Sequence, residues 1–243
     1  MKRVMLVAVL AVVLMLSLSA AALAAPTITN GDFELGNTGF TSDYTYAGTA
    51  GPSALWAAGT YTVGYSPKQY HALWSDFGPH GGSNMLIANG SADNSMVVWE
   101  GTVSGLVPGR VFSFNAWVAS SYPASPATLT LTFATGASQV IGVETTPTTP
   151  GEWKQISGTA LVPAGVYAAR LAITNSNEVL GGNDFCIDDI TVVDEGSTYG
   201  KTTGGIKFMA GSVEVQLNFV AMADEKGAKG NVKYAASNGN QFH

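Results

Sequence analysis

The side chains best suited to chemistry in this chain are carboxylates in two segments that lie far apart in the sequence. Asp32 and Glu34 lie near the beginning, and Asp188 and Asp189 lie within Phe185–Ile190. Both segments have the pattern of β-strands, whose neighbouring side chains point to opposite faces. Such acids can take part in catalysis, bind a hard cation, or simply be solvated at a strand end.

Catalytic patterns are otherwise weak. The chain has no His-Glu-x-x-His, Gly-x-Ser-x-Gly, P-loop or Cys/His metal motif, and its three histidines have no evident partner. A glycosidase needs two carboxylates about 5 to 10 Å apart, and nothing in the sequence pairs any two acids. We therefore expect no enzymatic activity. The acids that would have to pair are Asp76, Glu100, Glu144 and Asp184.

The single cysteine, Cys186, cannot form an internal disulfide. It is either a reactive or intermolecular thiol or a small buried side chain in a strand, and its strand-like context favours the second alternative.

The N-terminus has the pattern of a signal peptide. Lys2 and Arg3 precede the apolar run Val4–Leu18, and Ala22–Ala24 provides a small-x-small cleavage site. The run is shorter than the roughly 20 residues that a membrane span needs. We expect cleavage after Ala24 and a secreted protein, either extracellular or held at the cell surface.

Composition narrows the range of partners. The formal net charge is −6, only 12% of residues are charged, and the basic residues are scattered. Nucleic acid is therefore not an expected partner, because phosphate binding needs clustered Lys and Arg. Abundant Gly, with Thr, Ser and Val, favours many turns and strands.

Alternating segments predict the fold class. Apolar and polar side chains alternate in Val111–Val118, Thr128–Phe133 and Tyr167–Ile173, with Pro/Gly turns between them. No amphipathic helix follows the leader, so we expect an all-β protein, an antiparallel sandwich or barrel. The aromatic-rich segment Phe40–His80 lacks alternation and predicts long loops with one or two short strands. A loop of that length is expected to be functional.

A second unit is expected at the C-terminus. We expect a linker at Asp194–Ser197, so that residues 25–194 form one domain and residues 195–243 a small β-meander. Val213–Phe219 alternates cleanly, and Asn231–Ala235 can return beside it. A meander of this size is marginal alone. It therefore either packs on the first domain or lacks its last strands.

Several motifs occur in an order that resembles the galactose-binding-like jelly-roll modules of secreted, cellulase-associated carbohydrate-binding proteins. The likeness covers about residues 25–194 and implies a jelly-roll β-sandwich, while the tail resembles a small β module appended to secreted bacterial proteins. The motifs are Asn30–Glu34, Gly81–Leu86, Val97–Val103, Leu106–Gly109 with Val111–Phe114, and Phe185–Ile190.

The resemblance implies a structural calcium ion shared by the terminal strands. Carried over by position, its ligands are Glu34 and either Asp188 or Asp189. Ca²⁺ takes six to eight oxygen ligands, which suits carboxylates beside backbone carbonyls. Because adjacent strand residues point to opposite faces, only one aspartate reaches the ion, and we favour Asp188.

A sugar site needs an exposed aromatic ring beside planar polar side chains. If Phe112 and Phe114 fill the core, Trp117 and Asn115 lie on the outer face of their sheet, where Arg170 joins them if its strand is near. Alternatively, the segment Phe40–His80 folds over this face and buries Trp117. Trp99 and Trp153 are expected in the core. Ligand contacts are also expected from loop aromatics, namely Trp56, Trp74, Tyr61, Tyr65 and Tyr70.

These observations favour a secreted, non-catalytic, glycan-binding module stabilised by calcium. The alternative is a cell-surface or matrix protein that uses the sandwich and the edge of the C-terminal meander for protein contacts, since an unpaired strand can extend a partner's sheet.

Overall fold

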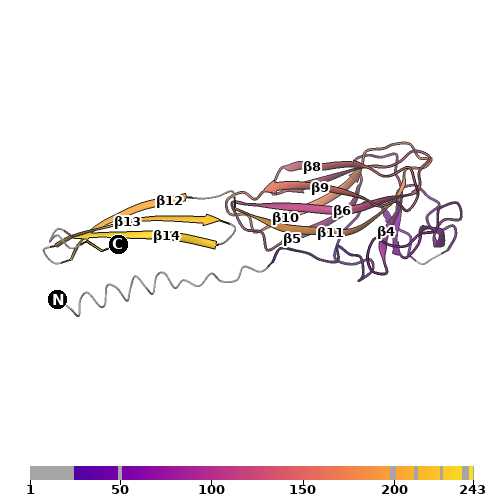
Figure 1. Cartoon of the computed structure of the whole chain (residues 1–243). Helices are drawn as coiled ribbons and strands as arrows, with labels where there is room; N and C mark the ends of the chain where they lie inside the picture. Colours follow the sequence, from indigo (N-terminus) through magenta and orange to yellow (C-terminus); the bar gives the residue numbers. More distant parts are fainter. Residues whose placement is uncertain are drawn as a thin grey trace.

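A computed structural model describes residues 25–48, 51–197, 201–210, 213–224, 227–236 and 241–242 (Figure 1). The expected signal peptide, residues 1–24, lies outside the described residues. Among the described residues, the structure has no helix with the length and hydropathy of a membrane span. The strands of the first unit are β1 Thr27–Ile28, β2 Thr45–Tyr46, β3 Thr60–Gly64, β4 Met85–Asn89, β5 Val97–Ser104, β6 Arg110–Tyr122, β7 Thr128–Ala134, β8 Ser138–Thr145, β9 Lys154–Leu161, β10 Ala168–Asn175 and β11 Asp184–Ser197, with a 3₁₀ helix at Pro67–Gln69.

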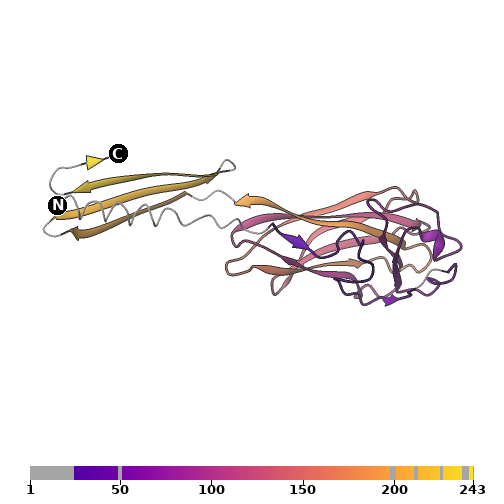
Figure 2. The same ribbon diagram turned by 90° about the horizontal axis from the view of Figure 1, so that it is seen from below.

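These strands form two sheets that face each other across one core. The first sheet has the order β1-β5-β10-β7-β8, and the second has the order β2-β3-β4-β11-β6-β9. All pairs are antiparallel except β2 with β3. The expected all-β jelly-roll sandwich is therefore confirmed. Figure 2 shows the purple loops and short strands that precede β4 at one end of the two layers, while the indigo arrow of β1 lies away from that end.

Period-two alternation builds the core as the sequence predicts. Phe112 and Phe114 on β6 point inward, as do Leu129 and Leu131 on β7 and Leu171 on β10, and each is fully buried. Burying one such side chain contributes about 1.5–3 kcal/mol. The inner faces of both sheets thus form one continuous apolar cluster, which also contains Trp99.

The two sheets come together along one edge, where β8 of the first sheet lies against β9 of the second. Gly142 and Gly158 make this approach possible, because a Cβ at either position would overlap a backbone carbonyl of the facing strand. The carbonyls are those of Ser157 and Ile141, respectively. The sandwich is therefore closed on this side by backbone contact.

The aromatic-rich segment forms loops with two short strands and the 3₁₀ helix, as expected. These loops cover part of the outer face of the second sheet. There they build a second apolar cluster, separate from the main core. Its buried members are Leu55, Tyr70, Trp74, Met85, Ile87 and Cys186, with Phe77 and Trp153 packed against them.

The predicted linker at Asp194–Ser197 is strand. β11 continues to Ser197, which pairs with Arg110 of β6, because β6 is long enough to offer hydrogen-bond partners beyond the expected boundary. A third sheet then follows in the order β12-β13-β14-β15. Its strands are β12 Lys201–Ala210, β13 Val213–Asp224, β14 Gly227–Ala236 and β15 Gln241–Phe242. The expected meander is antiparallel throughout the described residues.

Candidate functional site

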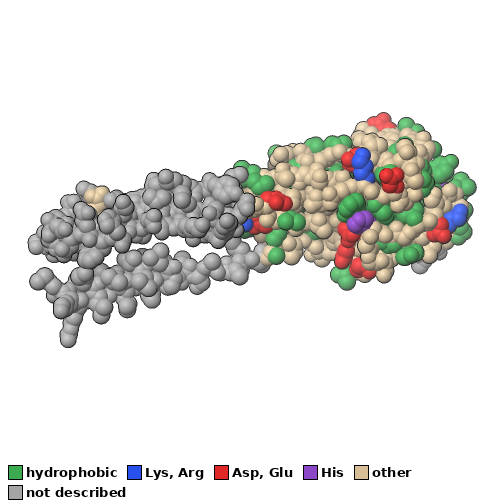
Figure 3. Space-filling model, viewed as in Figure 1, with side chains coloured by type: hydrophobic (Ala, Val, Ile, Leu, Met, Phe, Trp, Pro, Cys, Tyr) green, Lys and Arg blue, Asp and Glu red, His purple; other side chains and the backbone are tan. Residues whose placement is uncertain are grey.

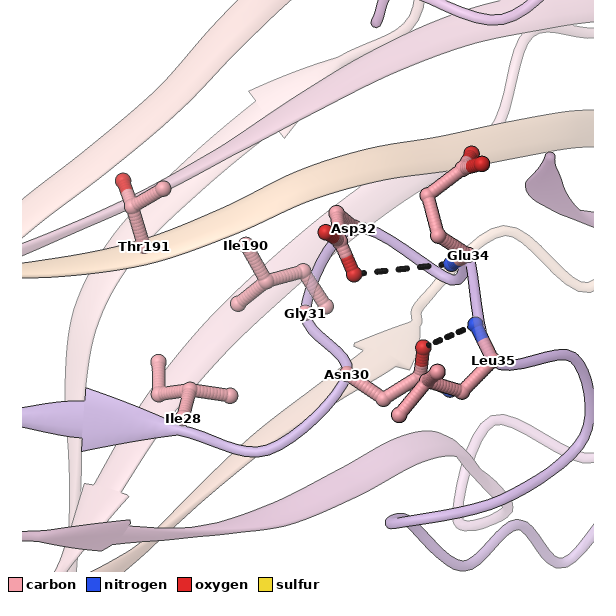
Figure 4. A pocket seen from close by; sticks show the side chains of 8 residues that line it. All are labelled: Ile28, Asn30, Gly31, Asp32, Glu34, Leu35, Ile190 and Thr191. Carbon is pink, nitrogen blue, oxygen red and sulfur yellow. Dashed lines mark hydrogen bonds between the residues drawn. The ribbon is translucent and has the colours of Figure 1, made fainter. Parts of the chain in front are cut away.

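The opening loop is docked onto β11 through Gly31 and Ile190. The Ile190 amide donates to the Gly31 carbonyl at 2.8 Å, and a Cβ on Gly31 would overlap the Ile190 carbonyl. Asn30 has a positive φ of 53° and locks the loop, because its side chain bonds three backbone groups. A pocket of about 430 Å³ lies here, and Figure 4 shows the side chains that line it. It is lined by Ile28, Asn30, Gly31, Asp32, Glu34, Leu35, Ile190 and Thr191.

Glu34 and Asp188 meet on the same glycine-containing loop. Glu34 Oε1 accepts the amides of Ser83 and Asn84, each at 2.7 Å. Asp188 Oδ2 accepts the amide of Gly81 at 3.1 Å. The fold thus brings together two acids that are far apart in the sequence, as the sequence predicted.

Asp188 is fully buried, and burial raises the pKa of its carboxyl to about 7. No basic side chain of the described residues forms an ion pair with it. A buried carboxylate without a cationic partner is costly, and a hard cation bound here would offset that cost. The described residues contain no group of three His, Cys, Asp or Glu suited to a metal, so backbone carbonyls would have to complete the coordination.

Asp189 also lies beside this loop, so the expectation that Asp188 and Asp189 point to opposite faces is wrong. The positive φ of 46° at Asp189 and the register shift between Asp188 and Thr191 interrupt the strand alternation, and the Asp189 carboxylate lies beside Gly81. Its Oδ2 lies 2.6 Å from Nδ1 of His80, with both side chains about 30% exposed. The imidazole stacks on Trp117 with ring centroids 4.0 Å apart and planes at 13°. Trp153 meets the imidazole edge-on at 5.7 Å. Trp153 is only partly buried and packs on the second cluster, whereas Trp99 is fully buried as expected.

The outer face of the second sheet matches the covered alternative only in part, because His80 stacks on Trp117 but the indole stays partly exposed. His80, the last residue of the aromatic segment, occupies a face of the indole on which a sugar ring would stack. Asn115 lies on the same face and is half-buried. Figure 3 shows a histidine on the visible face of the molecule, bordered by hydrophobic and acidic side chains.

Arg170 does not join Trp117 and Asn115. Leu171 is inward as expected, but β10 belongs to the first sheet. Arg170 therefore lies on the opposite outer face of the sandwich, where its guanidinium contacts Glu100 at 3.3 Å. The expectation of one shared face is wrong because alternation does not specify the sheet to which a strand belongs.

Three of the five loop aromatics are buried. Tyr61 packs in the main core, while Tyr70 and Trp74 pack in the second cluster; none is more than 7% exposed. In this structure they present no ring face to a ligand, so the expectation for these three is wrong. Tyr61 is buried because it lies in strand β3 and packs in the main core, whereas Tyr70 and Trp74 are buried because their loop folds back on the outer face of the second sheet.

Trp56 and Tyr65 are exposed, at 60% and 55%. One face of the Trp56 ring is supported by His71, with ring centroids 4.7 Å apart and planes at 17°. His71 in turn stacks on Trp74, with ring centroids 4.6 Å apart and planes at 21°. Burial, followed by the nearby charge of Lys68, lowers the pKa of His71. A neutral imidazole thus separates a buried indole from an exposed one, and the outer ring is preorganised.

The loop that carries Trp56 is fixed to the 3₁₀ helix by backbone hydrogen bonds. The Gly51 amide donates to the Gln69 carbonyl at 3.1 Å, and Leu55 donates to Tyr70 at 3.1 Å. Ala72 in turn donates to the Pro52 carbonyl at 2.9 Å. The exposed indole therefore has a defined orientation.

The other acids have structural partners. Glu144 pairs with Lys154 at 2.7 Å, and Asp76 accepts from Ser66 at 2.6 Å. Asp184 is 5% exposed; the Gly90 amide and the Trp74 indole act to lower the pKa of its carboxyl, but its Oδ1 has no hydrogen-bond partner among the described residues. Cys186 is fully buried beside Ser121, with its pKa raised by burial. The structure thus confirms the buried-side-chain alternative for the cysteine.

Sequence reasoning missed both histidines of the aromatic stacks and Lys68. His71 lies between Tyr70 and Trp74 in a loop, where no period specifies its direction. A signal was present, however, since His71 and His80 are the only histidines within residues 25–197 and both lie in the aromatic-rich segment.

No family model and no curated protein matches this chain. Solved structures resemble it weakly. The tandem CBM22-1–CBM22-2 domain of Paenibacillus barcinonensis Xyn10C is 13% identical, with a TM-score of 0.48, over 83% of this chain and 66% of that one. The C-terminal family 22 carbohydrate-binding module of Clostridium thermocellum Xyn10B is 16% identical, with a TM-score of 0.45, over 73% and 98%.

The N-terminal CBM22-1–GH10 modules of the Clostridium thermocellum xylanase, solved with xylohexaose, are 18% identical with a TM-score of 0.41. That match covers 56% of this chain and only 25% of the xylanase chain. The motif order had indicated carbohydrate-binding modules, and modules of that kind are found among the structural neighbours. At this level of similarity, no residue role is transferred to this chain.

Proposed function

We propose that this protein is a secreted, non-catalytic module that binds glycans through Trp56. The supporting observation is the Trp56–His71–Trp74 stack, which presents a 60% exposed indole on a rigid support. Ordering a side chain on binding costs free energy, and a ring that is already ordered avoids much of that cost. The signal-peptide pattern at residues 1–24 supports secretion.

Replacing the exposed ring is expected to remove most of the binding. Trp56→Ala should weaken retention on the glycan that the wild type binds best by at least about tenfold, as for an aromatic hot spot. Affinity electrophoresis against soluble and insoluble polysaccharides measures this loss. Tyr167→Ala is the matched control, because Tyr167 is 66% exposed and forms no ring contact with the described aromatics. Equal retention by wild type and Trp56→Ala would contradict the assignment.

We further propose that Glu34 and Asp188 hold a structural calcium ion. The burial of Asp188 without a cationic partner supports this, as does the shared loop that both acids contact. Bound calcium would supply the positive charge that stabilises the ionised Asp188 carboxylate. Asp189, which bonds His80, is not expected to be a ligand.

Chelation should therefore lower the melting temperature of the wild type, and added Ca²⁺ should restore it. A site with free Ca²⁺ at one hundred times its Kd adds about 2.7 kcal/mol of stability. Asp188→Asn should abolish the response, whereas Asp189→Asn should retain it. Thermal unfolding with and without chelator is the measurement, and an unchanged wild-type melting temperature would rule the site out.

Protein contact by strand addition is a second candidate function. Within the described part of the third sheet, β12 pairs only with β13, which leaves a ten-residue edge. An edge of that kind can extend a partner's sheet. Deleting residues 198–243 should abolish any concentration-dependent assembly seen by light scattering. A full chain that stays monomeric at every concentration tested would argue against this function.

A further inference from the structure

Lys68 differs from every other basic side chain of residues 25–197. That region has four, and three pair with carboxylates: Arg110 with Asp194, Lys154 with Glu144, and Arg170 with Glu100. Lys68 forms no ion pair with the described residues and donates only to the Ala72 carbonyl, at 2.6 Å. On a protein with a net charge of −6, it is an uncompensated, exposed positive charge.

This charge lies beside the Trp56 stack. Lys68 is in the 3₁₀ helix Pro67–Gln69, and that helix is fixed to the loop of Trp56 by the backbone bonds described above. Its ammonium also bonds the carbonyl next to His71, the residue on which Trp56 stacks. The described side chains thus place one rigid apolar ring and one unpaired cation around the same imidazole.

A hexuronic acid residue combines the two features that this arrangement can recognise. The C–H face of its pyranose ring is apolar and can stack on an indole, while its carboxylate projects from the ring edge. Lysine suits such a contact because its ammonium is a compact charge with several donors on a flexible stem. A neutral sugar would use the ring and leave the charge without a partner.

We propose that Trp56 and Lys68 form a subsite for a uronic acid residue of a glycan. The inference depends on the proposed glycan-binding function and adds a substrate class to it. An exposed ion pair contributes at most about 1 kcal/mol. The expected preference for an acidic over a neutral sugar is therefore about three- to fivefold, and it should fall at high salt because exposed charges are screened.

The test compares uronate oligosaccharides with the same oligosaccharides after carboxyl reduction, using calorimetry on the full chain. The wild type should prefer the acidic form at low salt and lose that preference at high salt. Lys68→Met should bind both forms equally, at the affinity of the wild type for the neutral form. Lys154→Met removes the same charge from a lysine that is paired with Glu144, and it should retain the preference.

The outcomes separate the two proposals. Equal binding of acidic and neutral forms by the wild type would overturn the uronate subsite and leave glycan binding intact. A preference that persists in Lys68→Met would also overturn it, as would full uronate binding by Trp56→Ala. Failure of the wild type to bind any glycan, acidic or neutral, would remove the proposed function together with its subsite.

Discussion

The free energy of unfolding should fall by about 3 kcal/mol between pH 4.5 and pH 7.5 because of Asp184 alone. Burial raises the pKa of this carboxyl from 3.8 to about 7, although the Gly90 amide and the Trp74 indole act to lower it. Between those values the native state holds one proton more than the unfolded chain. The free energy of unfolding therefore declines by about 1.4 kcal/mol for each pH unit in that window.

The stabilisation is complete below the unfolded pKa of 3.8 and is lost as the pH rises through about 7. Asp184→Asn removes the ionisation, so the stability of this variant relative to the wild type should increase by about 3 kcal/mol between pH 4.5 and pH 7.5. Urea unfolding at the two pH values measures the difference. The exposed Asp32 gives a matched control, because Asp32→Asn should retain the wild-type pH dependence. Identical pH profiles for the wild type and Asp184→Asn would show that Asp184 does not retain its proton.

Gly158→Ala should destabilise the sandwich by about 3 kcal/mol. A Cβ at this position would overlap the backbone carbonyl of Ile141, and a backbone strand cannot rotate away as a side chain can. The substitution would force β8 and β9 apart along the edge where the sheets close. The loss should appear as a lower denaturant midpoint with an unchanged slope.

Gly181→Ala is the control for this substitution. Gly181 is exposed and needs no positive φ, and a Cβ added to it would meet no atom within 4 Å. A gain of a few tenths to about 1 kcal/mol is expected there, because alanine restricts the unfolded chain. Comparable stability of Gly158→Ala and the wild type would mean that the sheets close without this backbone contact.

Which residues fill the core follows from the sequence alone. Alternation placed Phe112, Phe114, Leu129 and Leu131 inward because successive strand residues point to opposite faces, and all four are buried. The ends of the sandwich were also predictable, since Asn30–Glu34 and Phe185–Ile190 combine strand patterns with turn residues. That prediction failed at the end of β11, where pairing with β6 extends the strand to Ser197, and at Asn30–Glu34, which forms a loop after the two-residue strand β1.

Only the tertiary structure decided where the function-bearing side chains lie. Arg170 and Trp117 have equally clear strand positions, yet their strands joined different sheets, because pairing depends on long-range contacts that no local period records. The sequence also did not predict which side chains of the loop point toward the sheet and which point to solvent. The same segment buries Trp74, exposes Trp56 and sets His80 on Trp117. Each outcome depends on how the loop packs on the sheet, so the sequence determined the sandwich and its core, and packing determined the candidate site.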